Sequence, residues 1–492
     1  MNPGENNTAI SFSGYHPEAE HYHDEVFQAP GKPWPWADQL IQALEALPPG
    51  ELQRRQLASD ALLLERGITF TVYNDDDGGS TERIFPFDVL PRVITSKEWG
   101  RLERGLHQRI TALNCFLDDV YGAQHCLRDG IIPESLVLGN PAYRKQCQDL
   151  RPPGGVWINV AGIDLIRDAQ GVAHVLEDNC RCPSGVSYVV ENRRVLKRTL
   201  PRIFERMDVR PVDDYPLHLL HALRSVGPAG NPDPLVVVLT PGRYNSAYYE
   251  HTFLAQQMGV DLVEGGDLVV HDGYVQMRTT HGLQRVDVIY RRIDDDFLDP
   301  LCFREDSMLG VPGLMQVYRE GRVTLANAPG TGIADDKAVY AFVPDLIRYY
   351  LEDDPIIPNV PTYLCARDDE RAYVLEHLHE LVVKAVDGAG GYGMLIGPHA
   401  SQAEREAFAT IIRERPHKYI AQPTLNLSRV PTLIDGCVQP RHVDLRPFIL
   451  SGRNSTYIQP GGLTRVALRK GSLVVNSSQG GGSKDTWVLN AC

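Results

Sequence analysis

The spacing of hydrophobic and polar positions predicts helices and strands along most of the chain. Between about 97 and 122, leucine, isoleucine and valine recur every three or four residues, which predicts an amphipathic helix ending near Gly122. Two runs of strand character within 156–176 flank a polar stretch and predict a β-hairpin. Residues 189–206 return to a helical pattern, and the turn-forming sequence GPAGNPDP near 226–234 predicts a boundary.

The pattern changes after this boundary. A hydrophobic run at 235–239 predicts a buried strand, followed by a helix at 246–258 and another strand at 260–263. This strand–helix–strand order predicts a small open α/β domain. Strand-like stretches continue through 268–275 and 286–290.

The last third of the chain mixes both kinds of element. Helical patterns occupy 335–351 and 402–415, and a second hairpin is predicted at 381–396. From 441 to 489 the sequence is mostly strand with glycine-rich turns. The chain is therefore expected to be an α+β protein.

The first 60 residues have a different composition. They are rich in proline, glycine, histidine and acidic residues, which predicts a poorly packed arm, and a short helix follows near 37–47. The role of residues 1–80 stays open.

Composition and charge narrow the classes of function. The chain has 492 residues, of which 43% are hydrophobic and 23% charged, and its net charge is −14. This composition is typical of a globular protein, and the acidic balance argues against nucleic acid and anionic membranes as partners. The N-terminus lacks signal-peptide features and no hydrophobic run approaches the roughly 20 residues that span a bilayer. We therefore expect a cytoplasmic protein.

Cysteine usage indicates free thiols in a reducing compartment. The nine cysteines form no CxxC pair. Cys180 and Cys182 form a CxC, but no second cluster with metal-ligand spacing accompanies it. No function is assigned to these two thiols.

The first hairpin carries acidic residues that can face each other. If its turn is centred on Gln170 and Gly171, residues whose numbers sum to 341 lie opposite one another, so Asp164 pairs with Glu177. Asn179 then shares the face of Glu177. Two opposed carboxylates repel unless a cation lies between them, and these oxygen ligands suit a Mg²⁺ ion that also holds phosphates. The alternative is a solvated hairpin with ordinary surface acids, or a register that separates the pair.

The second hairpin carries a glycine-rich loop, VVKAVDGAGGYGMLIG at 382–397. Gly388, Gly390 and Gly393 fit GxGxxG, but a strand rather than a helix follows, so a dinucleotide-binding loop is not predicted. A glycine-rich hairpin can still fold its backbone N–H groups over phosphates, with Lys384 reaching a phosphate oxygen. The alternative is a flexible surface hairpin.

Together with other segments, these motifs resemble the ATP-grasp superfamily. GIDLIRDAQG…VLEDN resembles its metal segment, VVKAVDGAGGYG its phosphate lid, and ADDKAVY the start of a nucleotide-contacting helix. YIAQPTL resembles the hinge whose backbone meets adenine, and DLRPFIL resembles the strand whose arginine meets phosphates. The resemblance implies Asp164, Glu177 and Asn179 as Mg²⁺ ligands and Arg446 as a catalytic residue. For ATP it implies Lys337, Lys384, Gly388, Gly390, Gly391, Tyr392 and Gln422.

The order of the motifs is permuted, because the metal segment comes first here and last in ordinary ATP-grasp proteins. This is the arrangement of the glutathionylspermidine synthetase-like branch. The strings EDNCRCPSGVSY, TPGRYNSAYYEH and NSSQGGGSKDTWVL are similar to the bacterial circularly permuted ATP-grasp type 2 family, over roughly residues 80 to 489.

The resemblance implies a domain plan. It comprises an N-terminal arm with a short helix (1–80), the permuted part of the ATP-grasp domain with the metal hairpin (81–225), a pre-ATP-grasp-like α/β substrate domain (226–330), and the ATP-grasp domain with lid and hinge (331–492).

The implied function is ATP- and magnesium-dependent ligation of a carboxylate to an amine through an acyl phosphate, releasing ADP and phosphate. The substrates would be small molecules such as amino acids, small peptides or polyamines. Arg292 is a candidate clamp for the substrate carboxylate, although Arg291 and Arg292 could instead pair with Asp294–Asp296. Arg181 is a candidate for stabilising transition-state charge, with a loop salt bridge as the alternative.

A second hypothesis is a nucleotide-binding scaffold without turnover that partners a helical alpha-E domain protein. The retained metal ligands and both lysines favour an enzyme. The oligomeric state, a homodimer included, stays open.

Overall fold

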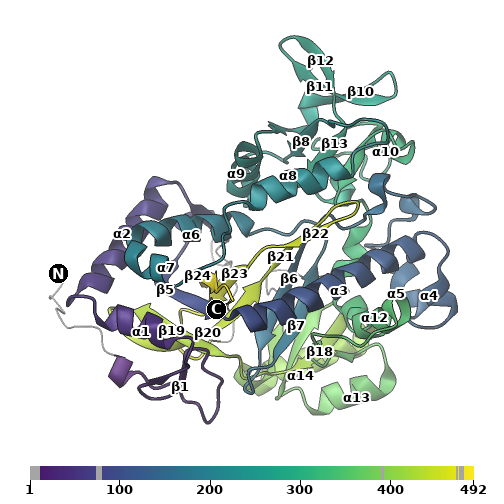
Figure 1. Ribbon diagram of the computed structural model, residues 1–492. Coiled ribbons are helices and arrows are strands. Elements are labelled where there is room, and N and C mark those ends of the chain that lie inside the picture. The colour runs from purple at the N-terminus through teal and green to yellow at the C-terminus, as the bar shows by residue number, and fades with distance from the viewer. Residues whose placement is uncertain (1–11, 74–79, 389–392, 473–474, 476–480, 492) are drawn as a thin grey trace.

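The computed structural model describes residues 12–73, 80–388, 393–472, 475 and 481–491. Its centre is a nine-stranded sheet in which segments far apart in the sequence lie side by side (Figure 1). The order is β22-β21-β6-β20-β23-β24-β5, with β7 paired to β6 and β19 to β20. The strands are β5 (Phe87–Ile94), β6 (Val160–Arg167), β7 (Ala173–Asn179), β19 (Arg429–Ile434), β20 (Cys437–Arg446), β21 (Phe448–Ser451), β22 (Thr456–Ile458), β23 (Leu463–Val466) and β24 (Gly482–Val488).

The pairing within this sheet explains why the motifs can be permuted. Strand β6, from the first half of the chain, pairs antiparallel with both β20 and β21 from the last quarter. The β6–β7 hairpin therefore joins its sheet across about 280 residues of intervening sequence, as the Leu165–Leu445 pairing shows. Chain order and spatial order are independent here, because strand pairing needs only adjacent backbones.

One long helix covers the central sheet. The predicted helix at 97–122 is α3 (Ser96–Val120), and Thr95 caps it by accepting a hydrogen bond from the Glu98 amide. Its hydrophobic face packs against α12 (Val343–Leu351) and the sheet, with Leu106, Leu113 and Leu117 fully buried. After α3 the chain continues through the short helices α4 (His125–Arg128) and α5 (Glu134–Leu138).

A smaller parallel sheet follows, in the order β14-β13-β8-β9. Its strands are β8 (Val236–Leu239), β9 (Asp261–Val263), β13 (Val288–Arg291) and β14 (Thr324–Ala326), flanked by helices α8 (Tyr215–Ser225), α9 (Tyr248–Met258) and α10 (Leu314–Arg319). The strand–helix–strand pattern predicted at 235–263 is confirmed. A three-stranded arm, β10 (Leu268–His271), β11 (Tyr274–Thr279) and β12 (Gly282–Arg285), projects from this layer at the top of Figure 1.

A third sheet, β15-β18-β16-β17, carries the second predicted hairpin. Its strands are β15 (Tyr363–Leu364), β16 (Leu381–Ala385), β17 (Leu395–Ile396) and β18 (Tyr419–Pro423), and helices α13 (Asp368–Glu376) and α14 (Gln402–Glu414) pack on it. Val383 pairs with Leu395 in antiparallel β16 and β17, which confirms the hairpin and excludes a helix after the glycine-rich loop.

The predicted helix at 335–351 is broken in two. Helix α11 (Lys337–Tyr340) ends before α12 begins at Val343. Pro344 lies in the first turn of α12, where its missing N–H is harmless but where it could not continue an earlier helix.

The prediction of a poorly packed N-terminal arm is wrong for the described part. Tyr15, Val26 and Phe27 are buried, and Glu25 forms an ion pair with Arg92 at 2.6 Å. Arg92 also donates to the Asp444 carbonyl at 2.8 Å, so the arm is tied to the central sheet. Composition misled here because scattered aromatic residues, too sparse to show a period, supply the packing.

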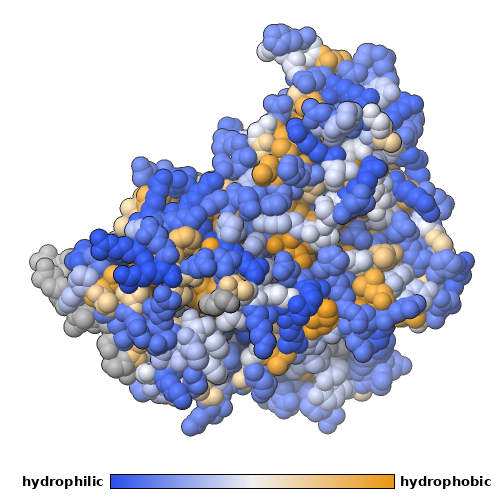
Figure 2. Space-filling view, viewed as in Figure 1, coloured by the Kyte–Doolittle hydropathy of each residue, from blue (hydrophilic) through white to orange (hydrophobic). Residues whose placement is uncertain are grey.

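The remaining elements are the pair β1 (Phe27–Ala29) and β2 (Lys32–Pro33), the pair β3 (Thr69–Tyr73) and β4 (Ser80–Ile84), and helices α1 (Asp38–Glu45), α2 (Glu51–Glu65), α6 (Val186–Thr199) and α7 (Pro201–Arg206). No helix in the described residues is both long and apolar enough to span a membrane. The face drawn in Figure 2 is mostly hydrophilic, with hydrophobic residues in small separate areas.

Candidate functional site

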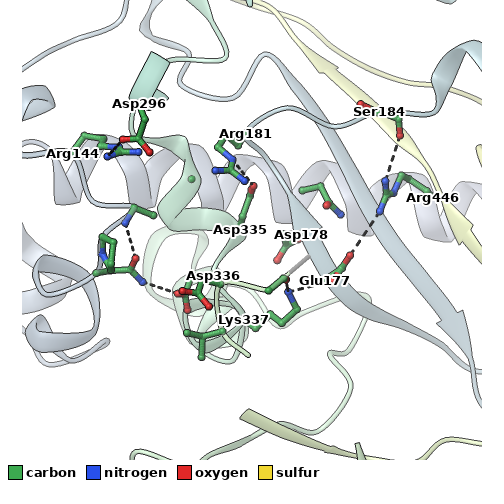
Figure 3. A pocket seen from close by; sticks show the side chains of 18 of the residues that line it. Arg144, Glu177, Asp178, Arg181, Ser184, Asp296, Asp335, Asp336, Lys337 and Arg446 are labelled. Carbon is green, nitrogen blue, oxygen red and sulfur yellow. Dashed lines mark hydrogen bonds and ion pairs between the residues drawn. The ribbon is translucent and has the colours of Figure 1, made fainter. Parts of the chain in front are cut away.

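A pocket of about 820 Å³ lies where the three sheets meet (Figure 3). The central sheet contributes Glu177 and Arg446, and the turn after β16 contributes Gly388. Ser246 and Asp296 come from loops that follow β8 and β13, and Gly332 follows β14. These three loops leave the carboxyl ends of parallel strands, which is where open α/β sheets bind ligands.

The hairpin register predicted for the acidic residues is confirmed. Asp164 pairs with Glu177 and Gly162 pairs with Asn179. The turn itself is one residue shorter than expected, because Arg167 pairs with Ala173, and a β-bulge between Asp164 and Leu165 restores the register. The bulge thus places Glu177 directly across from Asp164.

Two arginine side chains bind the Asp164 carboxylate. Its side chain is 1% exposed and accepts hydrogen bonds from Arg446 Nη2 at 2.8 Å and Arg465 Nη2 at 2.7 Å. Arg465 also bonds the buried Asp444 carboxylate, at 2.9 Å from its Nε. Burial alone would raise the pKa of Asp164, but Arg446 and Arg465 outweigh it and hold that pKa well below its ordinary value. The cation expected between the two acids is therefore supplied by Arg446.

Glu177 and Asn179 are less engaged. The Glu177 side chain is 28% exposed, and its nearest cations are Lys337 Nζ at 3.7 Å and Arg446 Nη2 at 3.8 Å, both beyond hydrogen-bond distance. The Asn179 Nδ2 atom is buried and has no hydrogen-bond partner in the described part of the chain. Both residues line the pocket.

These two side chains fit a Mg²⁺ ion, whereas Asp164 fits it less well. Mg²⁺ in phosphate-binding sites takes one or two side-chain oxygens and completes its shell with phosphate oxygens and water. Glu177 and the Asn179 amide can supply such oxygens. Among the residues that the structure describes, no group of three or more His, Cys, Asp or Glu side chains could hold a metal by itself.

Lys337 lines the pocket, whereas Lys384 is buried behind its wall and interacts electrostatically with Glu177 and Lys337. Lys337 begins α11, whose N-terminus is capped by Asp336, and its Nζ donates to the Gly388 carbonyl at 2.5 Å. Lys384 on β16 is buried, and its Nζ donates to Gln422 Oε1 at 2.8 Å. Burial lowers the pKa of Lys384 to about 8, although Glu177 partly opposes the shift. Gly390, Gly391 and Tyr392 of the expected lid lie outside the described residues.

Gln422 links β18 to β16. It lies on β18 opposite Val382 of β16, is 3% exposed, and its Nε2 donates to Thr362 Oγ1 at 3.0 Å. The side chain of Gln422 thus fixes Lys384.

Arg292 requires a correction, since it does not line the pocket. Its guanidinium is 1% exposed and donates to the Pro183 carbonyl at 2.8 Å, to Ser184 Oγ at 2.6 Å and to Glu250 at 3.2 Å. These bonds hold the loop before α6 and leave little capacity for a substrate carboxylate. Arg291 pairs with Asp295 at 2.7 Å, the alternative considered for this pair.

Arg181 does line the pocket. Its side chain is 41% exposed, with Nε 3.4 Å from Asp294 and 3.8 Å from Asp335. These are loose ion pairs, so both the transition-state role and the loop salt bridge fit its position.

Several site residues were missed from the sequence. Arg144, Asp335 and Arg465 line the pocket, and Asn327 holds its wall by donating to the carbonyls of Cys180 at 2.7 Å and Arg181 at 3.2 Å. Asp335 belongs to the motif ADDKAVY, so the sequence did carry a signal for it. Arg465 lies in an ordinary-looking strand, where no sequence signal sets it apart.

The sequence of this chain is similar to a known family and to several known proteins. The sequence model described as circularly permuted ATP-grasp type 2 matches residues 91–467. An uncharacterized protein of Synechocystis sp. is 61% identical over 95% of this chain and 97% of its own length. An uncharacterized Mycobacterium tuberculosis protein is 54% identical over 95% of this chain and 84% of its own length.

Two further similarities are more limited. A Frankia alni protein named as a candidate glutamate–cysteine ligase is 44% identical over 95% of this chain, which spans only 54% of that protein. An apo glutathione synthetase-like effector of Globodera pallida superposes with a TM-score of 0.55 over 89% of this chain and 96% of its own, at 12% identity. The latter likeness concerns the fold alone.

Proposed function

The chain belongs to the circularly permuted ATP-grasp type 2 family, and from this premise we propose that it joins a carboxylate to an amine through an acyl phosphate, using ATP and Mg²⁺. The family and the Frankia relatives support an ATP-dependent carboxylate–amine ligase. The substrates are small molecules, and amino acids, small peptides and polyamines are the classes to screen.

The observation that carries this proposal is Glu177, a pocket carboxylate flanked by two cations that it does not hydrogen-bond. Lys337 lies 3.7 Å and Arg446 lies 3.8 Å from it. The acid and the two cations face the same space but form no direct hydrogen bonds with one another. This arrangement suits a phosphate chain, whose oxygens need both a metal ion and basic side chains as partners. A purely structural cluster would close into direct hydrogen bonds, as Asp164 does with Arg446 and Arg465.

The protein's own residues have distinct proposed roles. Lys337, Lys384 and Gly388 hold phosphates, and the backbone of β18 at Gln422 meets adenine. Glu177 and Asn179 would hold Mg²⁺, which when bound supplies positive charge for phosphoryl transfer. Arg446, held rigidly by Asp164, presents fixed charge where the carboxyl oxygen and the transferred phosphoryl group meet.

The reaction then follows from what the pocket brings together. A carboxylate oxygen of the substrate takes the γ-phosphoryl group, leaving ADP. The amine, once it has lost its ammonium proton to solvent, bonds through nitrogen to the acyl carbon. The bond from that carbon to the phosphate oxygen breaks, and phosphate leaves with the electron pair and takes up the second proton that the nitrogen loses. Closure of the pocket would exclude water, which otherwise hydrolyses the acyl phosphate. Screening carboxylate–amine pairs for stimulated ADP release tests this function.

The rival is a nucleotide-binding scaffold that partners an alpha-E type protein without turnover. Nucleotide binding without any pair that stimulates ADP release would favour the scaffold.

Lys384 gives a pH-dependent prediction. Its pKa is lowered to about 8, and a bound phosphate favours the protonated form. Nucleotide affinity should therefore be constant below this pH and fall by up to about tenfold per pH unit above it. Lys384→Arg keeps its charge throughout and should remove the decline. Calorimetric titration of ATP and Mg²⁺ between about pH 7 and pH 9 measures both; parallel profiles for the two proteins would show that Lys384 does not contact the nucleotide.

A further inference from the structure

Asp335 has one oxygen that is held and one that faces the pocket. It ends the 3-10 turn Thr331–Asp335, which follows β14. Its Oδ1 accepts a hydrogen bond from the Cys180 amide at 2.5 Å. Its Oδ2 lies 3.8 Å from Arg181 Nε, beyond hydrogen-bond distance, and the side chain is 25% exposed. The carboxylate is thus fixed in orientation while one oxygen is left for another group.

The backbone of Arg181 is held in place, whereas its guanidinium group is only loosely paired. Asn327 Nδ2 holds the carbonyls of Cys180 and Arg181, at 2.7 and 3.2 Å. The guanidinium, in contrast, makes loose ion pairs with Asp294 and Asp335 among the residues that the structure describes. The buried arginines of this region, Arg292 and Arg465, make closer hydrogen bonds, at 2.6–2.8 Å from their terminal nitrogens.

The two side chains lie between the two ends of the pocket. Figure 3 shows Arg181 and Asp335 facing each other, with Asp296 on one side and Glu177 on the other. The Glu177 end carries Lys337 and Gly388, and the other end is built by the loops after β8 and β13. An amine bound at Asp335 would therefore lie next to a substrate carboxylate that is phosphorylated beside Glu177.

We propose that Asp335 and Arg181 form the amine subsite of this pocket, with Asp335 binding the ammonium group of the incoming amine and Arg181 binding the carbonyl oxygen that the amine approaches. This assignment rests on the proposed ligase function. It selects alkyl amines that are cationic before they react, such as the ammonium group of an amino acid or a polyamine, over uncharged amides or aromatic amines.

The charge around Asp335 supports this assignment. Burial, together with the nearby acids Asp178 and Glu177, raises the pKa of Asp335 to about 7, although Arg181 and the Cys180 amide oppose the shift. The surroundings of the Asp335 carboxylate thus provide too little positive charge to balance it, and a bound ammonium group would provide more.

Asp335→Asn tests the subsite, with Asp294→Asn as the matched control. Asparagine keeps the acceptor for the Cys180 amide, so folding should be preserved, which thermal unfolding checks. Asp294 also pairs with Arg181 but is half-exposed and absent from the pocket wall. Spermidine and glycinamide are titrated calorimetrically into each full-length protein with ADP and Mg²⁺. Asp335→Asn should weaken binding of whichever amine the wild type takes by about 10- to 100-fold, whereas Asp294→Asn should stay within about twofold.

Kinetics gives the second arm, with any carboxylate that stimulates ADP release. The KM of the amine should rise in Asp335→Asn by a factor similar to its loss of binding. Equal amine binding by the wild type and Asp335→Asn, or wild type that binds neither amine, overturns the subsite. Wild type that binds an amine through Asp335 but releases no ADP with any carboxylate overturns the ligase function and leaves the subsite standing.

Discussion

Glu177→Gln should reduce turnover at least about a hundredfold, because it removes a proposed metal-ligating carboxylate from the phosphate end of the pocket. The stability of the folded protein should change little. Glu177 is 28% exposed and its two cations lie 3.7 and 3.8 Å away, so little native bonding is lost. We expect the free energy of unfolding to change by less than about 0.5 kcal/mol.

Denaturant titration and ADP release measured on the same preparation test this separation. Mg²⁺-dependent ATP affinity should fall together with turnover. A variant that turns over like the wild type would assign Glu177 to the solvated-hairpin alternative, and a variant that unfolds readily would make Glu177 a structural residue.

Asp164→Asn should have the opposite effect, a large loss of stability. Asp164 is 1% exposed and bonds both Arg446 and Arg465, so the substitution leaves the buried Arg465 and the partly buried Arg446 short of their shared counter-charge. Removing one partner of a buried ion pair costs about 3–5 kcal/mol. The hydrogen bonds that asparagine retains place the expected loss near the lower end, about 3 kcal/mol.

The pH dependence of this loss has a defined sign. The pKa of Asp164 in the folded chain is depressed by Arg446 and Arg465 against the opposing effect of burial. Its ionisation therefore stabilises the fold above its unfolded pKa of about 4, and this stabilisation disappears as the pH falls below that value. Urea titrations at neutral and acidic pH should show the wild type and Asp164→Asn converging in acid. A constant difference, or equal stability at neutral pH, would contradict the ion-pair assignment.

The sequence predicted the hairpin because period-two patterning and a polar turn constrain register strongly. Asp164 and Glu177 do pair as predicted. The turn is one residue shorter than expected, and the β-bulge offsets the resulting shift in register. The bulge depends on how the hairpin packs, with the Val175 amide bonding the Pro358 carbonyl from a distant segment. Local pattern holds no information about that contact.

The roles within the site were harder to predict, because they depend on partners that the sequence does not place. Asp164 and Glu177 look equivalent along the chain, and only the approach of Arg446 and Arg465 from β20 and β23 separates them. For Arg292 the sequence offered a substrate carboxylate or Asp294–Asp296 as partners, whereas Glu250 on α9 is the acid that pairs with it. Asp335 differs from its neighbour Asp336 only because Asp336 caps a helix.

The most direct test of the ligase function follows oxygen from substrate to product. With a carboxylate–amine pair that stimulates ADP release, the carboxylate is labelled with ¹⁸O and the phosphate product is analysed by mass spectrometry. An acyl phosphate intermediate transfers one carboxylate oxygen to inorganic phosphate, so labelled phosphate should appear in step with the amide. Label in AMP, or amide formation without label in phosphate, would contradict the proposed reaction.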